Sequence, residues 1–150
     1  MRASDESAVA VLLHAYAAEY GDAIDTDVAA EAGRAFEVYS PPRGRMLVAE
    51  SAGRVVGCVA WKRVDASTCE MKRLFVEPIH RRSGTGRRLA SAIVADARAS
   101  GFARVGLVTT SAMSSAIALY RSMGFADCAP FRPLRTSCPI SMAMPVAGRR

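Results

Sequence analysis

The sequence predicts an α/β (α+β) protein in which helices cover both faces of a mixed β-sheet. Up to about residue 39, apolar side chains recur at helical spacing, and from residue 45 the pattern becomes that of extended strands. Three consecutive strand segments separated by short polar turns then predict an antiparallel meander. A strand–helix–strand–helix order follows, and such crossovers place strands in parallel. The two kinds of pairing together predict a mixed sheet.

Turn and breaker residues divide the chain into these elements. The stretch "SPPRG" at 40–44 separates the helical part from the strands, and "SAGR" at 51–54 predicts a hairpin turn. Pro78 ends the third strand because it cannot donate a ladder hydrogen bond. Gly101 and Gly124 lie just after helical patterns, where a left-handed residue commonly closes a helix. The expected helices are 4–20 with Ser4 as N-cap, 26–39, 87–100 and 111–123, and the expected strands are 45–50, 55–64, 70–76, 104–110 and 138–146.

Length and composition predict one globular unit. The 150 residues are 51% hydrophobic and 23% charged, which is typical of folded rather than disordered chains. There is no repeat or linker, so we expect a single domain over residues 1–150. No apolar run reaches the roughly 18 to 20 residues of a membrane span, and the N-terminal segment lacks the layout of a secretory signal. We therefore expect a cytoplasmic protein with no membrane partner.

The net charge of +6 comes almost entirely from arginine, since Lys62 and Lys72 are the only lysines. The planar fork of arginine suits phosphate, so the charge indicates an anionic partner, either nucleic acid, a membrane surface or a phosphorylated small molecule. A genome-wide preference for arginine codons explains the excess over lysine equally well. Surface aromatics interleaved with the charges and a recognition-helix pattern are both missing from the sequence, so we expect no nucleic-acid partner.

The four cysteines form no CxxC pair and lie near no histidine-rich segment, so we expect no metal. Cys58 and Cys69 lie in apolar strand segments, where cysteine usually behaves as a small hydrophobe. We expect buried, reduced thiols, with disulfides or a catalytic thiol as the alternatives.

The segment "HRRSGTGRRLA", residues 80–90, predicts an anion-binding turn. It follows a strand and opens a helix, so the first amides of the helix lack helical partners and the positive end of the helix dipole lies there. Gly84 and Gly86 let several N–H groups converge on one anion, the arrangement that binds phosphate. The spacing excludes an ATP-binding P-loop, which has four residues between its glycines and then lysine. It also departs from the dinucleotide fingerprint, because Leu89 replaces the third glycine.

Three motifs, in order, resemble those of the GNAT superfamily of acyl-CoA-dependent N-acyltransferases. The Arg-x-x-Gly-x-Gly turn is similar to its pyrophosphate-binding turn, "EMKRLFVEP" to its fourth strand, and "AIALYRSMGF" to its helix with a catalytic tyrosine. The similarity spans about residues 46–125. It implies the GNAT fold, with the sheet splayed between two parallel strands, here 70–76 and 104–110. It also implies acetyl-CoA, or another acyl-CoA, bound in the opening as co-substrate without a metal.

The resemblance further implies which residues bind the cofactor. Backbone groups of the strand 70–76 would pair with the pantetheine arm like an added strand, and the glycine-arginine turn would hold the diphosphate. The implied cofactor-binding residues are Leu74, Phe75, Val76, Arg81, Arg82, Ser83, Gly84, Thr85, Gly86 and Arg87.

Tyr120 and Glu70 are the first candidates for proton transfer. By resemblance, Tyr120 would donate a proton to the departing CoA thiolate, and the alternative is an aromatic anchor for its helix. Glu70 is the candidate base for the amine, because strand alternation places it on one face with Lys72 and Leu74, toward the cleft. The alternative for Glu70 is a surface ion pair with Lys72. The other candidates near neutral pH are His14 and His80.

One position departs from the family pattern, and the acceptor is open. Many members carry asparagine where this chain has Met113, so an amide contact is missing there or is replaced by Ser111, Ser114 or Ser115.

We expect direct transfer to a small or amino-acid-like primary amine, with a protein N-terminus or lysine as the alternative acceptor. Acyl transfer through a cysteine, a non-catalytic acyl-CoA-binding module and a homodimer are also compatible with the sequence. The arginines that could meet an acidic substrate, unless they are merely solvated, are Arg43, Arg45, Arg132 and Arg135.

Overall fold

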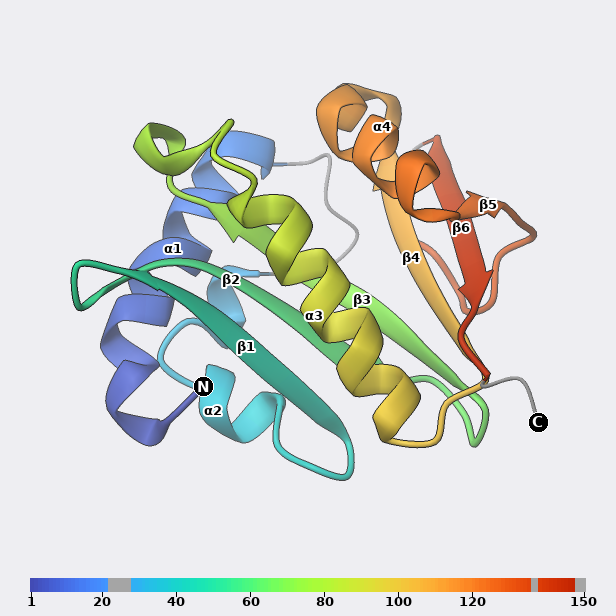
Figure 1. The fold of residues 1–150 in the computed structure, drawn as a ribbon, viewed down its shortest axis with the longest axis horizontal. Coiled ribbons are helices and arrows are strands. Elements are labelled where there is room, and N and C mark those ends of the chain that lie inside the picture. The colour runs from blue at the N-terminus through green and yellow to red at the C-terminus, as the bar shows by residue number, and fades with distance from the viewer. Residues whose placement is uncertain (22–27, 136–137, 148–150) are drawn as a thin grey trace.

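A computed structural model of the protein describes residues 1–21, 28–135 and 138–147. They form one six-stranded sheet with the order β1-β2-β3-β4-β6-β5, in which β3 and β4 are parallel and the other neighbours antiparallel (Figure 1). The predicted mixed sheet is confirmed. The strands are β1 (Gly44–Ser51), β2 (Arg54–Arg63), β3 (Thr68–Val76), β4 (Arg104–Thr110), β5 (Ala126–Asp127) and β6 (Pro139–Pro145), and the α-helices are α1 (Glu6–Tyr20), α2 (Ala35–Val38), α3 (Thr85–Ala99) and α4 (Ser114–Met123).

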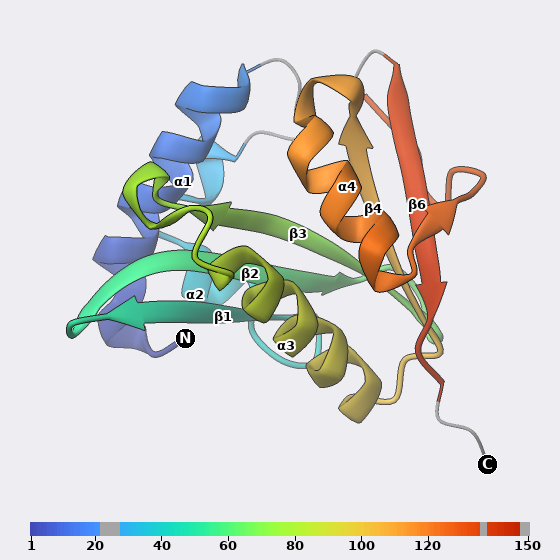
Figure 2. The same cartoon turned by 45° about the horizontal axis from the view of Figure 1, so that its top comes forward.

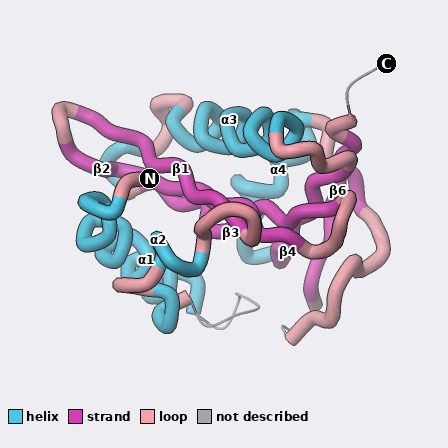
Figure 3. The backbone as a smooth tube through the Cα atoms, turned by 90° about the horizontal axis from the view of Figure 1, so that it is seen from below, coloured by secondary structure: helices cyan, strands magenta, loops and turns pink. Residues whose placement is uncertain are grey.

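Helices cover both faces of the sheet, as predicted. Figure 3 shows α3 and α4 on one side of the strands and α1 and α2 on the other. On the first face Leu89 and Ile93 of α3 pack in the cluster that contains Met71, and on the second Leu12 of α1 packs in the cluster that contains Phe75. Each such fully buried side chain contributes roughly 1.5–3 kcal/mol. None of the helices in the described part of the chain is long and apolar enough to cross a membrane.

The start of the chain and the segment before β1 differ from the predictions. The helix expected over 26–39 is not continuous, because Gly33 has φ +80° and separates the 3₁₀ turn Ala29–Glu31 from α2; the beginning of that prediction, 26–27, lies outside the described residues. Ser4 is not the N-cap of α1, because a 3₁₀ turn ends at Asp5 and places Asp5 there. The other predicted elements are present, with ends shifted by no more than three residues.

The two parallel strands separate along their length, which confirms the predicted splay. Pairing between β3 and β4 covers only the three residues of β3 from Thr68 to Glu70, opposite Arg104 to Gly106. Beyond Glu70, β3 continues to Val76 and β4 to Thr110 without pairing to each other. Figure 2 shows the two strands diverging toward the end where α3 begins. We call the opening between them the cleft.

A β-bulge interrupts β3 on its way along the cleft. On β2 the register advances two residues, from Cys58 to Ala60, while on β3 it advances three, from Phe75 to Lys72. Arg73 is the extra residue, and its φ of +59° lies in the left-handed region that residues other than glycine rarely adopt. A bulge shifts the alternation of side chains between the two faces of a strand, so the face expected for each residue beyond Arg73 must be reassigned.

Candidate active site

The glycine-arginine turn follows β3 and presents a run of unpaired backbone amides. Arg82 (φ +63°) and Gly84 (φ +81°) are both left-handed, one residue apart, which turns successive N–H groups toward a common point. Within the described part of the chain, the N–H groups from Arg82 to Arg87 donate to no acceptor, and the next bond of the helix is Arg88 N–H to Gly84 O at 3.0 Å. The predicted amide cradle at the start of α3 is therefore open in the structure.

Side chains of the turn brace it without occupying these amides. The Ser83 hydroxyl donates to the His80 carbonyl at 2.6 Å and lies 2.8 Å from the Thr85 hydroxyl. Arg87 donates to the Ser122 hydroxyl of α4 at 2.7 Å and so links the two helices across the cleft. Arg82 is exposed, and the part of the chain that the structure describes offers it no polar partner.

The guanidinium of Arg81 has partners within the protein, and cofactor binding by this residue stays a prediction. Its guanidinium donates to both oxygens of Glu19 in α1, at 2.8 and 2.5 Å, and to the Val76 carbonyl at 2.9 Å. It also stacks 5.2 Å from the centre of the Phe75 ring. The carboxylate of Glu19 raises the pKa of Arg81. Arg81 thus ties the turn to α1 and to β3.

The edge of β3 that faces the cleft supplies the second part of the predicted cofactor site. Leu74, Phe75 and Val76 lie beyond the last β3–β4 pair, so their backbone groups on that side have no strand partner among the described residues. The Val76 carbonyl is the exception, since Arg81 already donates to it. An extended ligand could pair with the remaining groups as an added strand does.

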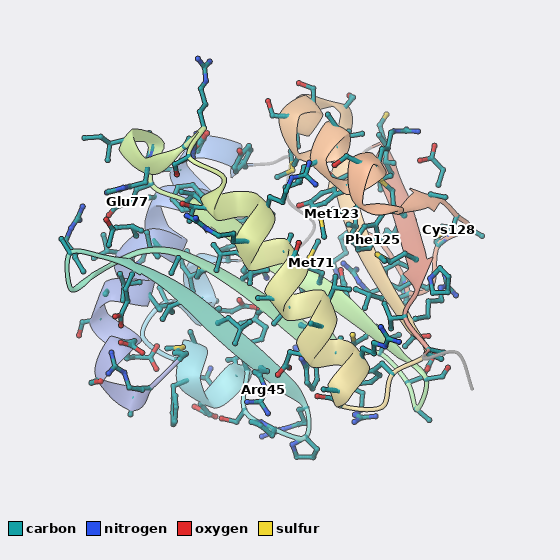
Figure 4. The ribbon with its side chains drawn as sticks, viewed as in Figure 1. Arg45, Met71, Glu77, Met123, Phe125 and Cys128 are labelled. Carbon is teal, nitrogen blue, oxygen red and sulfur yellow. The ribbon has the colours of Figure 1, made fainter. Side chains whose placement is uncertain are left out.

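Tyr120 lies on α4, on the same side of the sheet as α3. It is 7% exposed and its ring packs against Phe125 with centroids 5.8 Å apart. Met71 of β3 lies with Met123 and Phe125 in the apolar space between α3 and α4 (Figure 4). Burial is the largest cause of a pKa for Tyr120 well above its ordinary value, so the phenol stays protonated at neutral pH.

Glu70 lies at the point where β3 and β4 part, and it is buried rather than on the surface. Both of its oxygens accept hydrogen bonds from Arg132, at 2.7 and 2.8 Å, and Lys72 Nζ lies 3.9 Å from Glu70 Oε2. Arg132 belongs to the segment between β5 and β6, whose Phe131 packs on the bare backbone of Gly106, opposite Glu70. The partner of Glu70 is thus a bidentate arginine 62 residues away.

The bulge overturns one prediction about this strand. Glu70, Lys72 and Leu74 were expected to share a face, but Leu74 packs in the cluster on the α3 side, whereas the pairs made by Glu70 lie on the other side. The bulge at Arg73 shifts the alternation by one residue. The Leu74 side chain therefore lies on the α3 side of the sheet.

The bulge is held by contacts that the sequence analysis missed. Arg73 donates to both oxygens of Glu31, at 2.8 and 2.9 Å, and the Tyr39 hydroxyl donates to Glu31 at 2.7 Å. The Cys58 thiol donates to the Arg73 carbonyl at 3.3 Å. Nothing in the local pattern of "EMKRLFV" signals an arginine with positive φ, because its partners come from a distant segment.

The remaining candidates fall into three groups. His14 is exposed on α1 and His80 Nε2 lies 3.9 Å from Glu77 Oε2, and both stay alternatives to Glu70 as the base. Met113 packs against the apolar cluster on the α1 side, where it replaces the family amide with an apolar contact. Cys58 and Cys69 are buried as predicted, while Cys138 is exposed, and all four cysteines are free. The described residues contain no group of His, Cys, Asp or Glu that could hold a metal ion.

Comparison with known proteins identifies the family of the chain. The family model of the acetyltransferase (GNAT) domain matches residues 42–127. An IAA acetyltransferase of Azospirillum brasilense is 40% identical over 109 residues, which cover 72% of this chain and 71% of that protein.

Solved structures share the fold over nearly the whole chain. A Klebsiella pneumoniae protein described as an acyl-CoA N-acyltransferase is 26% identical, with a TM-score of 0.73 over 91% of this chain and 88% of its own. A Salmonella typhimurium structure with acetyl-CoA bound is 22% identical, with a TM-score of 0.75 over 100% of this chain and 93% of its own. With the amide turn at the head of α3 and the splayed strands beside it, the chain belongs to the GNAT family of acetyltransferases.

Proposed function

We propose that the protein transfers an acetyl group from acetyl-CoA to the primary amine of a small acceptor, by direct attack of the amine in a ternary complex. The observation that carries the proposal is the run of free amides from Arg82 to Arg87 at the open end of the cleft. Family membership and the likeness to the Salmonella structure that holds acetyl-CoA support the choice of co-substrate.

The turn and the β3 edge fit the two ends of such a ligand. Amides without partners that converge at a helix N-terminus bind a diphosphate through charge-assisted hydrogen bonds. The unpaired edge from Leu74 to Val76 then suits the amide-bearing pantetheine arm, which directs the thioester toward the point where the strands part. The groups that would hold the ligand are thus main-chain groups of the turn and of the β3 edge. The side chains of the turn therefore need not be apolar or basic.

Tyr120 would act as the acid. Acetyl-CoA supplies the acyl group as a thioester, and the sulfur leaves as a thiolate when its bond to the acyl carbon breaks. Because burial keeps the Tyr120 phenol protonated, Tyr120 can donate its proton to that sulfur. Since a thiolate is already a fair leaving group, we expect proton donation to increase the rate by an amount at the lower end of the range for acid catalysis.

Glu70 would act as the base. Arg132 holds its carboxylate in one orientation through two hydrogen bonds, and each oxygen retains a further lone pair. Those lone pairs can take a proton from the acceptor amine, directly or through one water molecule, at the vertex of the cleft.

Direct transfer is favoured over an acyl-cysteine intermediate. Cys58 and Cys69 are both 0% exposed, and burial raises the pKa of each thiol to about 12. The thiolate is the reactive form of cysteine, so neither residue is suited to carry an acyl group.

The test is a screen for thiol release from acetyl-CoA with a panel of small amines, amino acids and peptides, followed by mass spectrometry of products and protein. We expect thiol release that depends on an amine, an N-acetyl product in equal amount, and no acylated protein when acetyl-CoA is present alone. Acetyl-CoA binding without release for every amine would instead indicate a non-catalytic binding module. An acylated protein would indicate a cysteine carrier.

A further inference from the structure

Lys72 is a cation built into the side of the sheet that faces α1. Its side chain is only 10% exposed, and burial lowers the pKa of its ammonium group to about 8, so it is mostly charged at pH 7. The groups that act on it are Glu70, Arg73, Arg132 and Glu31. A charge at this depth needs hydrogen-bond acceptors.

The carboxylates beside Lys72 are already held by other cations. Both oxygens of Glu70 accept from Arg132, and both oxygens of Glu31 accept from Arg73. Lys72 Nζ lies 3.9 Å from Glu70 Oε2, which is too long for a hydrogen bond, and it donates none to any residue in 1–21, 28–135 or 138–147. Among the described residues the ammonium group thus has no hydrogen-bond acceptor, and it lies beside Glu70, where the two strands part.

Two buried hydroxyl groups lie on the same face of the sheet. Thr110 shares a face of β4 with Gly106, the register partner of Glu70, and Ser141 of β6 pairs with Val108 of that face. Thr110 and Ser141 are each 6% exposed, and the oxygen of neither has a hydrogen-bond partner among the described residues. Buried polar groups are nearly always hydrogen-bonded, so such a pair indicates a place where a ligand or water binds.

We propose that the acceptor carries a carboxylate beside its reactive amine, as an amino acid does, and that Lys72 and the hydroxyls of Thr110 and Ser141 bind this carboxylate. The close approach of Lys72 to Glu70 suits a carboxylate and an amine on neighbouring atoms, the one held by Lys72 and the other delivered to Glu70. This inference rests on the proposed function and adds the substrate class to it.

The test compares amines that differ only in the carboxylate, such as phenylalanine with phenethylamine and methionine with 3-(methylthio)propylamine, together with the amino-acid amides. We expect kcat/KM to favour the amino acid at least about tenfold in each pair that reacts, because the carboxylate makes charged hydrogen bonds. Lys72→Gln should raise KM for the amino acid about tenfold and leave KM for the decarboxylated amine and the amide unchanged.

Lys62→Gln is the matched control, because Lys62 is the other lysine and lies exposed on β2. The Lys62→Gln variant should still favour the amino acid over the decarboxylated amine. Ser141→Ala, which removes a buried oxygen without a partner, should also raise KM for the amino acid alone and serves if Lys72→Gln does not fold.

Two results would overturn the inference, namely equal rates for acid and decarboxylated amine, or a preference that survives both Lys72→Gln and Ser141→Ala. In either case amine acetylation would continue and the proposed function would stand. If no amine released thiol from bound acetyl-CoA, both would fall together.

Discussion

At the scale of single residues, burial decides what the side chains of the cleft can do. Tyr120 and Glu70 are 7% and 4% exposed, yet their surroundings differ. The phenol of Tyr120 lies among apolar side chains, which raises its pKa and preserves the proton that it would donate. The carboxylate of Glu70 accepts two hydrogen bonds from Arg132, which fix its orientation. The two proposed roles thus follow from two environments.

Tyr120→Phe tests the acid at this scale. The change removes one oxygen and keeps the ring that packs on Phe125, so the fold and the affinity for acetyl-CoA should be unchanged. We expect kcat to fall by up to about a hundredfold, the lower range for acid catalysis. Thiol release gives kcat, calorimetry gives the Kd for acetyl-CoA, and a thermal melt checks the fold. An unaltered kcat would remove Tyr120 from the mechanism.

At the scale of elements, the start of α3 is a binding device because its helix begins without a cap. The N-cap position is occupied by Gly84, which has no side chain to satisfy the first amides. A Cβ at Gly84 would meet no atom within 4 Å, so it is the left-handed conformation at φ +81° that favours glycine there. The free amides and the helix dipole then act at the same place.

Gly84→Val tests the turn, with Gly101→Val as a matched control. Gly101 follows the other end of α3, is also left-handed (φ +92°) and also has open space around its Cβ position. Each change should lower the free energy of unfolding by about 1–2 kcal/mol, the cost of a left-handed L-residue. Only Gly84→Val should raise the Kd for acetyl-CoA, by at least about a hundredfold, because the amides no longer converge.

Calorimetry and urea titration measure the two effects separately. Equal affinities in the two variants would show that the cofactor is bound elsewhere. A loss of affinity in both would show that strain in α3, rather than the geometry of its first turn, is responsible.

At the scale of the whole molecule, buried ionisable groups make the free energy of unfolding depend on pH in the alkaline range. Burial raises the pKa of Tyr16, Cys58 and Cys69 to about 12 and raises that of Tyr120, whereas unfolded tyrosine and cysteine titrate near about 10 and 8.5. Between these limits the native state binds more protons than the unfolded state, so stability falls as pH rises. Lys72 acts in the opposite direction between pH 8 and about 10.4, because its folded pKa is lowered to about 8.

We therefore expect the free energy of unfolding to be highest below about pH 8.5 and to fall most steeply above pH 10, where the tyrosines dominate. Urea titrations under reducing conditions from pH 7 to 11.5 measure this dependence. In Lys72→Gln the opposing group is gone, so the fall should begin at lower pH. A stability that rises between pH 10 and 11.5 would contradict the prediction.

Most of the fold could be predicted from the sequence because it depends on local chemistry. Helical and extended periodicity, together with glycines and Pro78, predict the order of the elements, and nearly all of them are present. The motifs around Gly84 and Tyr120 predict the family, which the comparisons confirm. The prediction of a continuous helix over 26–39 was wrong at Gly33, where the chain adopts a left-handed conformation that the apolar pattern did not indicate.

The sequence by itself determined the amide turn, because glycine at position 84 adopts the left-handed conformation and offers the first amides of the helix no side-chain cap. Through the family resemblance it also determined which strands would splay. Only the tertiary structure decided the pairing of Glu70 with Arg132 and of Arg81 with Glu19. It also decided the bulge in β3 that places Leu74 on the face opposite to Glu70. The physical reason is range. A turn is specified by the dihedral preferences of its own residues, whereas an ion pair between segments 62 residues apart depends on how the whole chain packs.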